Sequence, residues 1–303
     1  MRRAAGGDAV IVFSPEVEAA LRDGTPVVAL ETTLVAHGFP PGEGVAVGTE
    51  SERRVRQAGA VPATIGVLDG AVRAGLTAQE LERFGDDARK VGPRDLAACA
   101  TQGAVGGTTV GGTLAVCRAT GIRFMGTGGI GGVHRGWADG SLDVSADLGE
   151  LARTQTLVVS SGVKSLLDVP ATAEALETLG VPALGFATDE LPLFYTARGG
   201  PPVSARVETA GEAAAIARAH WELGGGGLLL ARPPDESLDD VEPLVEEALA
   251  LARERGIAGQ AVTPFVLSFL HERSGGATLR ANKELVVANA QLAAEVAVAY
   301  GRG

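Results

Sequence analysis

The sequence predicts an α/β fold in which a mostly parallel central sheet lies between two layers of helices. Short apolar and β-branched runs alternate along the 303 residues with longer segments of helical periodicity, as in chains that build such layers. Most of the apolar runs are continuous rather than alternating, which is typical of strands covered on both faces. Hydrophobic residues make up 46% of the chain, enough for a sizeable core. We therefore expect a three-layer α/β/α sandwich.

Six apolar runs are predicted strands. In chain order they are TPVVAL at 25–30, PATIGV at 62–67, RFMGT at 123–127, TLVVS at 156–160, PALGFA at 182–187 and GGLLLA at 226–231. Helices are predicted between them at 44–59, 95–103, 112–120, 170–179, 210–223 and 239–255, and a largely apolar final helix is predicted at 284–300.

The helix predicted at 170–179 has the clearest end signals. Asp168 can cap its N-terminus, and Pro170 lies in its first turn, where the missing N–H costs nothing. Gly180 follows the last helical residue and can end the helix. These three residues fix the expected bounds of the helix more closely than periodicity alone.

Composition excludes several classes of protein. The formal net charge of −11 argues against general binding to nucleic acid or anionic membranes, although one phosphate could be held locally. Cys99 and Cys117 offer neither a disulfide framework nor a zinc spacing. No apolar run approaches the roughly 18 residues that span a bilayer, and the N-terminus does not resemble a secretory signal, so we expect a cytoplasmic protein. No composition break marks a linker, so we expect one domain over residues 1–303, with residues 1–8 as a candidate disordered tail.

Lysine is rare in this chain. Of 26 basic residues only three are lysines, Lys90, Lys164 and Lys283. A desolvated lysine amine can lose its proton and attack a carbonyl carbon, which an arginine cannot do. Lys164 follows the predicted strand at 156–160 through a small-residue turn, an unusual place for a merely solubilising charge. Lys164 is therefore the candidate nucleophile, although chance survival on a solvated face would explain any single lysine.

Carboxylates stand near predicted strands at two other places. Glu31 follows the strand at 25–30, where apolar neighbours would raise its pKa and suit it to act as a general acid. An exposed or salt-bridged glutamate is the simpler alternative. Asp143 and Asp147 stand four residues apart with Ser145 between them. Their oxygens suit a hard cation such as Mg²⁺ or Mn²⁺, but they could equally cap a helix that begins nearby.

A glycine-rich loop, GTGGIGG at 126–132, contains a formal G-x-G-x-x-G pattern. The residues after it show no helical periodicity, so a dinucleotide site is rejected. Two interpretations stay open: a nest of backbone N–H groups for one phosphate or sugar oxygen, or glycines used only for a tight turn. His134 and Arg135 follow directly and could add positive charge to such a nest.

Together these segments resemble the pseudouridine-5′-phosphate glycosidase family. The resemblance runs in family order from about residue 25 to the C-terminus, and its most specific blocks are GGIGGVHRG and the D-x-S-A-D-L run. The matching segments are ALETTLVAHG, KVGPRDL, GGTTVGGT, GTGGIGGVHRG, LDVSADL, SSGVKSLLDVPAT, GFATDELPLFYT, VTPF and ANKELVVANA.

The resemblance implies a manganese-dependent enzyme, with one Mn²⁺ per subunit, that reversibly cleaves the C–C glycosidic bond of pseudouridine 5′-phosphate to uracil and ribose 5-phosphate. Lys164 falls on the family's nucleophile, which forms a Schiff base with C1′ of the opened ribose, and Glu31 falls on its proton donor. Asp143 matches the manganese ligand. The positions that match substrate contacts are Lys90, Val110, Ser145, Ala146 and Asp147, and Lys90 or His134 would suit the 5′-phosphate. The family is homotrimeric with an α/β/α core.

These roles agree with what the chemistry needs. The leaving atom is carbon, so direct expulsion of the base would put charge on C5 of uracil, whereas an ordinary glycosidase with paired carboxylates releases oxygen or nitrogen. Addition of an amine to C1′ of the opened ribose supplies an electron sink, and protonation at C5 then makes the C–C scission resemble a retro-aldol step. Lys164 and Glu31 could supply that amine and that proton.

The chain departs from the family pattern at four places. Thr32 stands where serine is usual, residues 38–44 read GFPPGEG, Gln260 replaces a lysine, and Lys283 replaces an apolar residue. These departures bear on substrate entry or subunit packing more than on the chemistry, and Lys283 is treated as incidental.

Two alternatives to the leading hypothesis stay open. The same lysine and glutamate could act on a related C-nucleotide or phosphosugar. A catalytically silent phosphosugar-binding protein is the alternative from another class, but it would have little need for Glu31 and Lys164 together.

Overall fold

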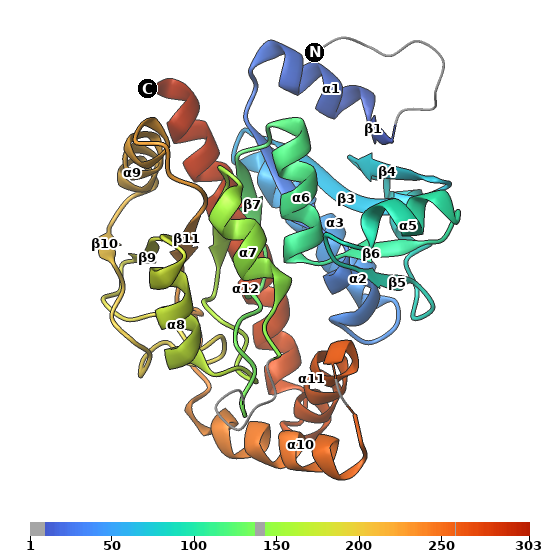
Figure 1. Ribbon diagram of the computed structural model, residues 1–303, viewed down its shortest axis with the longest axis vertical. Helices are drawn as coiled ribbons and strands as arrows, with labels where there is room; N and C mark the ends of the chain where they lie inside the picture. Colours follow the sequence, from blue (N-terminus) through green and yellow to red (C-terminus); the bar gives the residue numbers. More distant parts are fainter. Residues whose placement is uncertain (1–9, 137–142, 258) are drawn as a thin grey trace.

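The computed structural model of the chain describes residues 10–136, 143–257 and 259–303. The disordered tail predicted at 1–8 lies outside the described residues. Figure 1 shows a central sheet with helices on both faces and a pair of helices at one end.

Eleven strands of the described chain form one sheet. Their bounds are β1 Ile11–Phe13, β2 Val27–Glu31, β3 Val61–Leu68, β4 Ala71–Ala74, β5 Arg89–Val91, β6 Gly106–Thr108, β7 Phe124–Gly126, β8 Leu157–Ser160, β9 Ala183–Phe186, β10 Ala205–Val207 and β11 Leu228–Ala231. The main path is β1-β4-β3-β2-β7-β8-β11-β9-β10, and β6 pairs with β3 and β5. Among these pairings only β3 with β4 and β3 with β6 are antiparallel. The predicted mostly parallel sheet is therefore confirmed.

Each face of the sheet has its own apolar core, because successive side chains of a strand point to opposite faces. In β2, Val28 and Leu30 belong to a core that also contains Ala290 and Ala294 near the C-terminus. Ala29 of the same strand belongs to the other core. All of these side chains are buried, which explains why the strand reads as a continuous apolar run.

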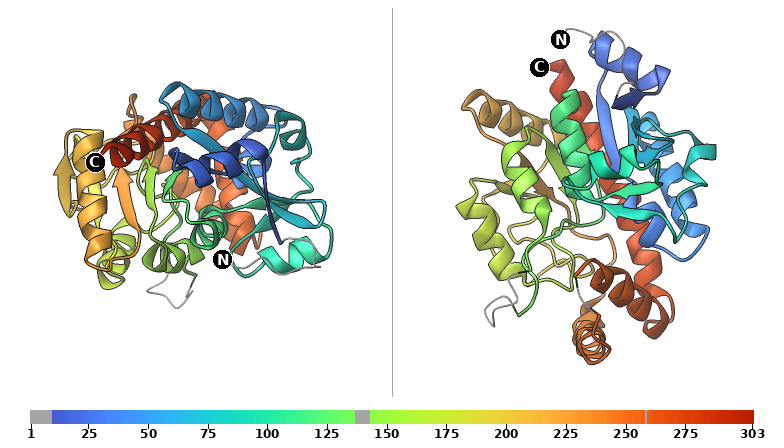
Figure 2. Two further views of the ribbon diagram at one scale, coloured as in Figure 1. Left: turned by 90° about the horizontal axis from the view of Figure 1, so that it is seen from above. Right: turned by 45° about the vertical axis from the view of Figure 1, so that its right-hand side comes forward.

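Helices cover both of these cores. Their bounds are α1 Pro15–Asp23, α2 Thr33–His37, α3 Glu43–Gln57, α4 Ala78–Leu81, α5 Leu96–Thr101, α6 Val110–Thr120, α7 Ala146–Arg153, α8 Val169–Thr178, α9 Ala210–Glu222, α10 Glu242–Glu254, α11 Val262–Arg273 and α12 Ala277–Arg302. The helices α3, α9 and α12 lie together on one face of the sheet, and α6, α7 and α8 lie on the other (Figure 2). The predicted α/β/α sandwich is confirmed.

All predicted strands and helices form, with bounds shifted by a few residues. The helix predicted from 239 starts as a 3₁₀ turn, Asp239–Val241, and becomes α-helical at Glu242. At the start of α8 the Asp168 carboxylate accepts a hydrogen bond from the N–H of Ala171 at 3.0 Å, and Gly180 beyond its end has φ 68°. The predicted cap and stop of this helix are confirmed.

The sequence analysis missed five strands and four helices, α1, α2, α4 and α11, and it considered a fifth helix, α7, only as an alternative to a cation site. The strands β1, β4, β5, β6 and β10 have only three or four residues each, too few to show an apolar run. One signal was available: Asp69 and Gly70 form the two-residue turn between β3 and β4, and both have positive φ, 51° and 77°. An Asp-Gly pair between apolar runs is a strong hairpin signal.

The helices α10 and α11 pack against each other at one end of the molecule (Figure 1). The family segment VTPF forms the first turn of α11. Because these helices lie near the carboxyl ends of the central strands, they cover the edge of the sheet where ligands usually bind. No helix of the described chain is long and apolar enough to cross a membrane.

Two of the four departures from the family pattern contact each other. The Nζ atom of Lys283 in α12 lies 2.5 Å from Oε2 of Glu43, the first residue of α3 and part of the altered segment 38–44. Both side chains are more than one-third exposed, so the pair contributes only about 0.2–1 kcal/mol. Lys283 thus has a charged partner on the neighbouring helix, although this pair contributes little to stability.

Candidate active site

A cavity of about 720 Å³ opens at the carboxyl ends of β2, β5 and β8. Eight of the nine predicted site residues line it: Glu31, Lys90, His134, Asp143, Ser145, Ala146, Asp147 and Lys164. The ninth, Val110, is buried in the first turn of α6, directly after Thr109, which lines the cavity. The fold thus brings together residues that are far apart in the sequence.

Glu31 is the last residue of β2 and is almost completely buried. The hydroxyl of Thr127 donates a hydrogen bond to Oε1 of this carboxylate. Burial raises the pKa of Glu31 above its ordinary value, and the nearby positive charge of Lys164 only partly opposes that increase. A buried carboxyl group with a raised pKa can carry a proton for transfer.

Thr32 fixes the start of the loop that follows Glu31. Its hydroxyl donates to the carbonyl of Ile65 at 2.7 Å and accepts from the N–H of Thr108 at 3.0 Å. Threonine in place of the family's serine therefore still supplies a hydroxyl group that makes both hydrogen bonds. The additional methyl group is buried with the rest of the side chain.

The two lysines in the cavity lie close enough to influence each other. Burial lowers the pKa of Lys90 in β5, and the charge of Lys164 lowers it further. Lys164 follows β8, and its backbone N–H donates to the carbonyl of Ile130 at 3.1 Å, which anchors it to the glycine loop. Within the described residues neither amine has a carboxylate at ion-pair distance. Both amines are therefore available to a ligand.

His134 and Asp143 lie close together in the lining of the same cavity. The distance between His134 Nδ1 and Asp143 Oδ2 is 3.6 Å, and the His134 N–H donates to the Asp143 carbonyl at 2.9 Å. Burial lowers the pKa of His134, while the Asp143 carboxylate opposes that change. The Asp143 side chain is 43% exposed, so its carboxylate faces the open part of the cavity.

Asp147 behaves differently from Asp143. Its side chain is buried, and its two oxygens accept hydrogen bonds from the backbone N–H groups of Gly111 at 2.7 Å and Gly131 at 2.8 Å. The hydroxyl of Ser145 caps α7 by accepting from the N–H of Asp147 at 3.2 Å. The capping interpretation is thus confirmed for Ser145, and Asp147 joins the start of α6 to the glycine loop.

We expect Asp147→Ala to destabilise the protein by about 2–4 kcal/mol, because two buried N–H groups lose their acceptors. Asp143→Ala is the matched control, four residues away on the exposed wall, and should change the free energy of unfolding by less than about 0.5 kcal/mol. Denaturant unfolding of both variants without added metal measures the difference. Equal losses of stability would contradict the structural role of Asp147.

The glycines at 126–132 allow close packing rather than a special backbone conformation, since none of them has positive φ. A Cβ atom would lie 2.7 Å from Ala290 at Gly126, 2.6 Å from Phe194 at Gly129, and 2.3 Å from Thr172 at Gly132. The N–H groups of residues 130, 131 and 133 donate to protein acceptors. These three N–H groups are therefore not free to bind an anion, which weighs against the interpretation of this loop as an anion nest.

Several residues in or next to the cavity were not predicted from the sequence. Thr127, which contacts Glu31, lies inside the glycine motif but was not singled out from it. Arg118 and Arg153 line the rim, where both pair with the buried carboxylate of Glu150. Thr263 of α11 also lines the cavity; it lies in the family segment VTPF, but no role was predicted for it.

Comparison with known proteins places the whole chain among related sequences. The family model for Indigoidine synthase A like proteins matches residues 16–299. A pseudouridine-5′-phosphate glycosidase of Streptomyces griseus is 50% identical over 297 residues, which cover 95% of this chain and 91% of the relative. A protein of the same name from Nocardioides is 47% identical over 298 residues, covering 96% and 97%.

Two solved structures have a similar fold. The prealnumycin C-glycosynthase AlnA, in complex with ribulose 5-phosphate, matches with a TM-score of 0.87 and 39% identity over 98% of each chain. An indigoidine synthase A-like protein of Thermotoga maritima matches with a TM-score of 0.88 and 36% identity over 100% of each chain. The arrangement of elements is thus shared from one end of the chain to the other.

Proposed function

The chain belongs to the indigoidine synthase A-like family, as the pseudouridine-5′-phosphate glycosidases that resemble it over nearly its whole length also indicate, and we propose that it shares their activity. In this proposal it reversibly cleaves pseudouridine 5′-phosphate to uracil and ribose 5-phosphate. The observation that carries the proposal is the presence of Glu31, Lys164 and a second amine, Lys90, in one cavity. The resemblance to the pseudouridine-5′-phosphate glycosidase family that the sequence predicted is confirmed.

In the proposed reaction the Lys164 amine bonds to C1′ of the ribose as the bond between C1′ and the ring oxygen O4′ breaks, and O4′ takes up the proton that the amine loses and becomes a hydroxyl. The nitrogen lone pair then forms the C=N bond as the bond between C1′ and C5 of uracil breaks. The electron pair of the broken bond takes up a proton at C5, which releases uracil. Water adds to the imine and frees ribose 5-phosphate and the amine, so one water is consumed for each substrate cleaved.

Glu31 is proposed as the source of the proton for C5. Its burial supports this role, because burial raises the pKa of the Glu31 carboxyl group, and a carboxyl group with a raised pKa is a useful general acid. The Thr127 hydroxyl holds one carboxylate oxygen, so the other oxygen is the one presented to substrate. In the synthetic direction the same carboxylate would take the proton from C5.

Lys90 and His134 are proposed to hold the 5′-phosphate. Both line the cavity with Lys164, and the Lys90 amine has no carboxylate partner at ion-pair distance within the described residues. A compact ammonium group is a strong donor to phosphate oxygens. Phosphate bound by Lys90 and His134 would leave Lys164 free to react at C1′.

We propose that the cavity binds Mn²⁺ through a single protein ligand, Asp143. Asp143 faces the open part of the cavity with His134 beside it, whereas the described residues hold no group of three or more histidines, cysteines or carboxylates suited to a metal. Asp143 would therefore hold the ion, with water as its other ligands, as hard cations accept. When bound, the ion would supply positive charge to phosphate or sugar oxygens.

We expect Asp143→Asn to weaken Mn²⁺ binding by at least about 10-fold, because the anionic ligand is lost. The electron paramagnetic resonance signal of free Mn²⁺, titrated with protein, measures the affinity. Asp189→Asn is the control, since Asp189 pairs with Arg206 on the surface. Unchanged affinity in Asp143→Asn would contradict the assignment.

The activity itself is tested in both directions. The protein is incubated with uracil, ribose 5-phosphate and Mn²⁺, and pseudouridine 5′-phosphate is sought by mass spectrometry; the cleavage of pseudouridine 5′-phosphate is followed in parallel. Product in either direction supports the proposal. Its absence in both directions would overturn it.

A second candidate activity is C–C bond formation or cleavage on a related phosphosugar. The observation that favours it is the similarity to the prealnumycin C-glycosynthase AlnA, at 39% identity over 98% of each chain. The identity to pseudouridine-5′-phosphate glycosidases is higher, which favours the first proposal. Competition between uracil and other carbon acceptors in the synthetic assay separates the two.

We further propose that the protein is a homotrimer of the cytoplasm, as the family resemblance implies. Light scattering in solution would give the mass of the assembly. A monomeric mass would contradict the trimer.

A further inference from the structure

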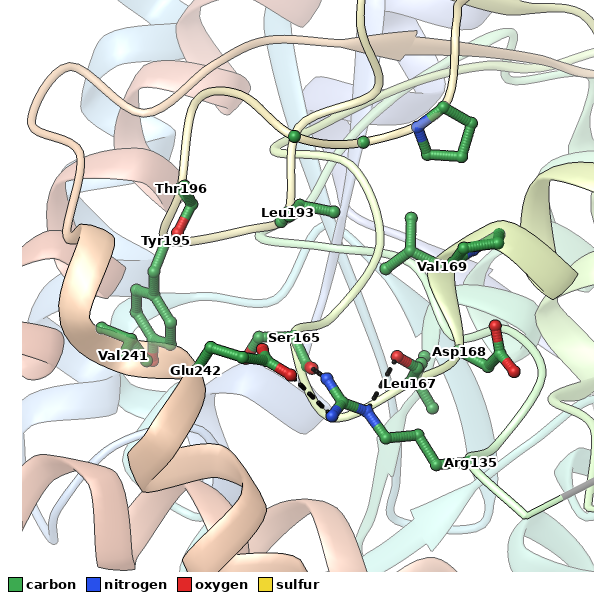
Figure 3. Close-up of a pocket in the computed structure, with 14 residues that line it drawn as sticks. Arg135, Ser165, Leu167, Asp168, Val169, Leu193, Tyr195, Thr196, Val241 and Glu242 are labelled. Carbon is green, nitrogen blue, oxygen red and sulfur yellow. Dashed lines mark hydrogen bonds and ion pairs between the residues drawn. The ribbon is translucent and has the colours of Figure 1, made fainter.

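Arg135 lies behind the segment that carries Lys164. It lines a second cavity of about 650 Å³ together with residues of the segment 165–170 that follows Lys164 (Figure 3). The side chain of Leu167 borders both cavities, so this segment is the wall between them. No role in the proposed reaction has been given to Arg135 so far.

The guanidinium of Arg135 binds three acceptors at once. Nη2 donates to the carbonyl of Ser165 at 2.8 Å, and Nε donates to the carbonyl of Leu167 at 3.3 Å. Nη1 donates to the carboxylate of Glu242 in α10 at 2.7 Å. Figure 3 shows these contacts converging on the guanidinium from the nucleophile segment and from the helix.

The two carbonyls belong to a tight turn that begins at Lys164. The N–H of Leu167 donates back to the carbonyl of Lys164 at 3.0 Å, and an isolated β-bridge pairs Leu167 with His134. Ser165 and Leu167 are buried, so their carbonyls depend on donors within the protein. Arg135 therefore holds the turn at the first and third residues after Lys164.

An arginine is suited to this place for geometric reasons. Its planar fork presents several N–H donors at fixed angles and can serve two carbonyls and a carboxylate together. A lysine ammonium has donors around one atom and could not reach all three acceptors. The Glu242 side chain is about half exposed, so its ion pair with Arg135 is the weakest of the three contacts.

We propose that Arg135 is a positioning residue for Lys164, which sets the place of the nucleophilic amine by holding the turn behind it. The inference rests on the proposed function, since it assumes that Lys164 forms the imine. Small displacements of a reacting group lower the rate of bond formation much more than they lower substrate affinity. Arg135 thus serves the covalent step through the backbone and touches no substrate.

The test measures imine formation at Lys164 directly. Wild type, Arg135→Ala, Arg135→Lys and Glu242→Gln are incubated with ribose 5-phosphate and trapped with borohydride at timed intervals, and the adduct is quantified by mass spectrometry. We expect trapping to slow by about 10- to 100-fold in Arg135→Ala and in Arg135→Lys, with KM within about 3-fold of wild type. Glu242→Gln should stay within about 3-fold, because an exposed ion pair contributes little.

Rescue by a free guanidinium ion separates positioning from general loss of structure. Millimolar guanidinium should restore part of the trapping rate to Arg135→Ala and none to Arg135→Lys, whose side chain still fills the space. Equal trapping rates in wild type and Arg135→Ala would overturn this inference and leave the proposed function intact. Absence of any adduct in wild type would overturn both. If Arg135→Ala does not fold, the trapping rate of Arg135→Lys decides in the same way.

Discussion

Lys164→Ala is expected to lower the turnover of pseudouridine 5′-phosphate by at least about 10³-fold, because the proposed reaction loses its covalent step. Borohydride trapping with ribose 5-phosphate should label Lys164 in the wild type and give no adduct in the variant. Mass spectrometry of the digested protein identifies the labelled residue. The amine lines the cavity and, within the described residues, is not tied up by a carboxylate, so its removal should leave the fold unchanged.

Lys164→Arg is the matched control for charge. It keeps a cation in the cavity but cannot form an imine, so it should be as inactive as the alanine variant. Lys90→Ala should instead keep the adduct and raise KM, because its proposed contact is with phosphate. An adduct on Lys90 in the wild type, or full activity of Lys164→Arg, would show that the nucleophile is assigned to the wrong residue.

Glu31→Gln is expected to lower kcat by about 10²- to 10⁴-fold, because the amide cannot donate a proton to C5. The amide oxygen can still accept the hydrogen bond of Thr127, so the local structure should persist. Imine trapping with ribose 5-phosphate should be largely retained, since that step needs Lys164 and not the C5 proton. Single-turnover cleavage and trapping, measured side by side, separate the two steps.

The same substitution should raise stability at neutral pH. Burial raises the pKa of Glu31 above its ordinary value of 4.5, so the folded protein holds this proton where the unfolded chain has lost it. That contribution is complete below pH 4.5 and is lost as pH rises through the folded pKa. The amide of Glu31→Gln stays neutral, so the variant does not lose this stability as the pH rises. Its free energy of unfolding should therefore exceed that of wild type above pH 4.5 and equal it below that pH.

Denaturant unfolding from pH 4 to pH 8 would check the sign. A variant less stable than wild type at neutral pH would mean that the Glu31 carboxylate is well compensated in the folded state. A kcat close to that of wild type would remove Glu31 from the acid role. Both outcomes concern this residue alone, because the other titrating groups are common to both proteins.

The layers of the fold were predictable from the sequence because they depend on local patterns. The strand β2 is apolar throughout, since Val28 and Ala29 face two different cores, and that requirement is written into consecutive residues. The short strands β5 and β6 were not predictable. They form because their neighbours in the sheet supply partners, and the residues of β6, Gly-Gly-Thr, carry no strand signal of their own.

The candidate site could be predicted only in part. Glu31 and Lys164 could be predicted from the sequence because each follows a predicted apolar strand. Residues at such positions meet at one edge of a parallel sheet. The spacing of Asp143 and Asp147 suits a cation and a helix cap equally, so only the family resemblance gave them different expected roles, as metal ligand and substrate contact. Contacts with Gly111 and Gly131 assign Asp147 to the backbone and leave Asp143 facing the cavity.

The sequence by itself determined which chemical groups are present and that they follow the ends of strands, because local patterns mark the positions of strands and polar loops along the chain. Only the tertiary structure decided which groups are free to act. Asp147 is engaged by N–H groups 36 and 16 residues away, and Arg135 reaches carbonyls 30 and 32 residues away. Such partners are set by the packing of distant segments, and no pattern within one segment records them.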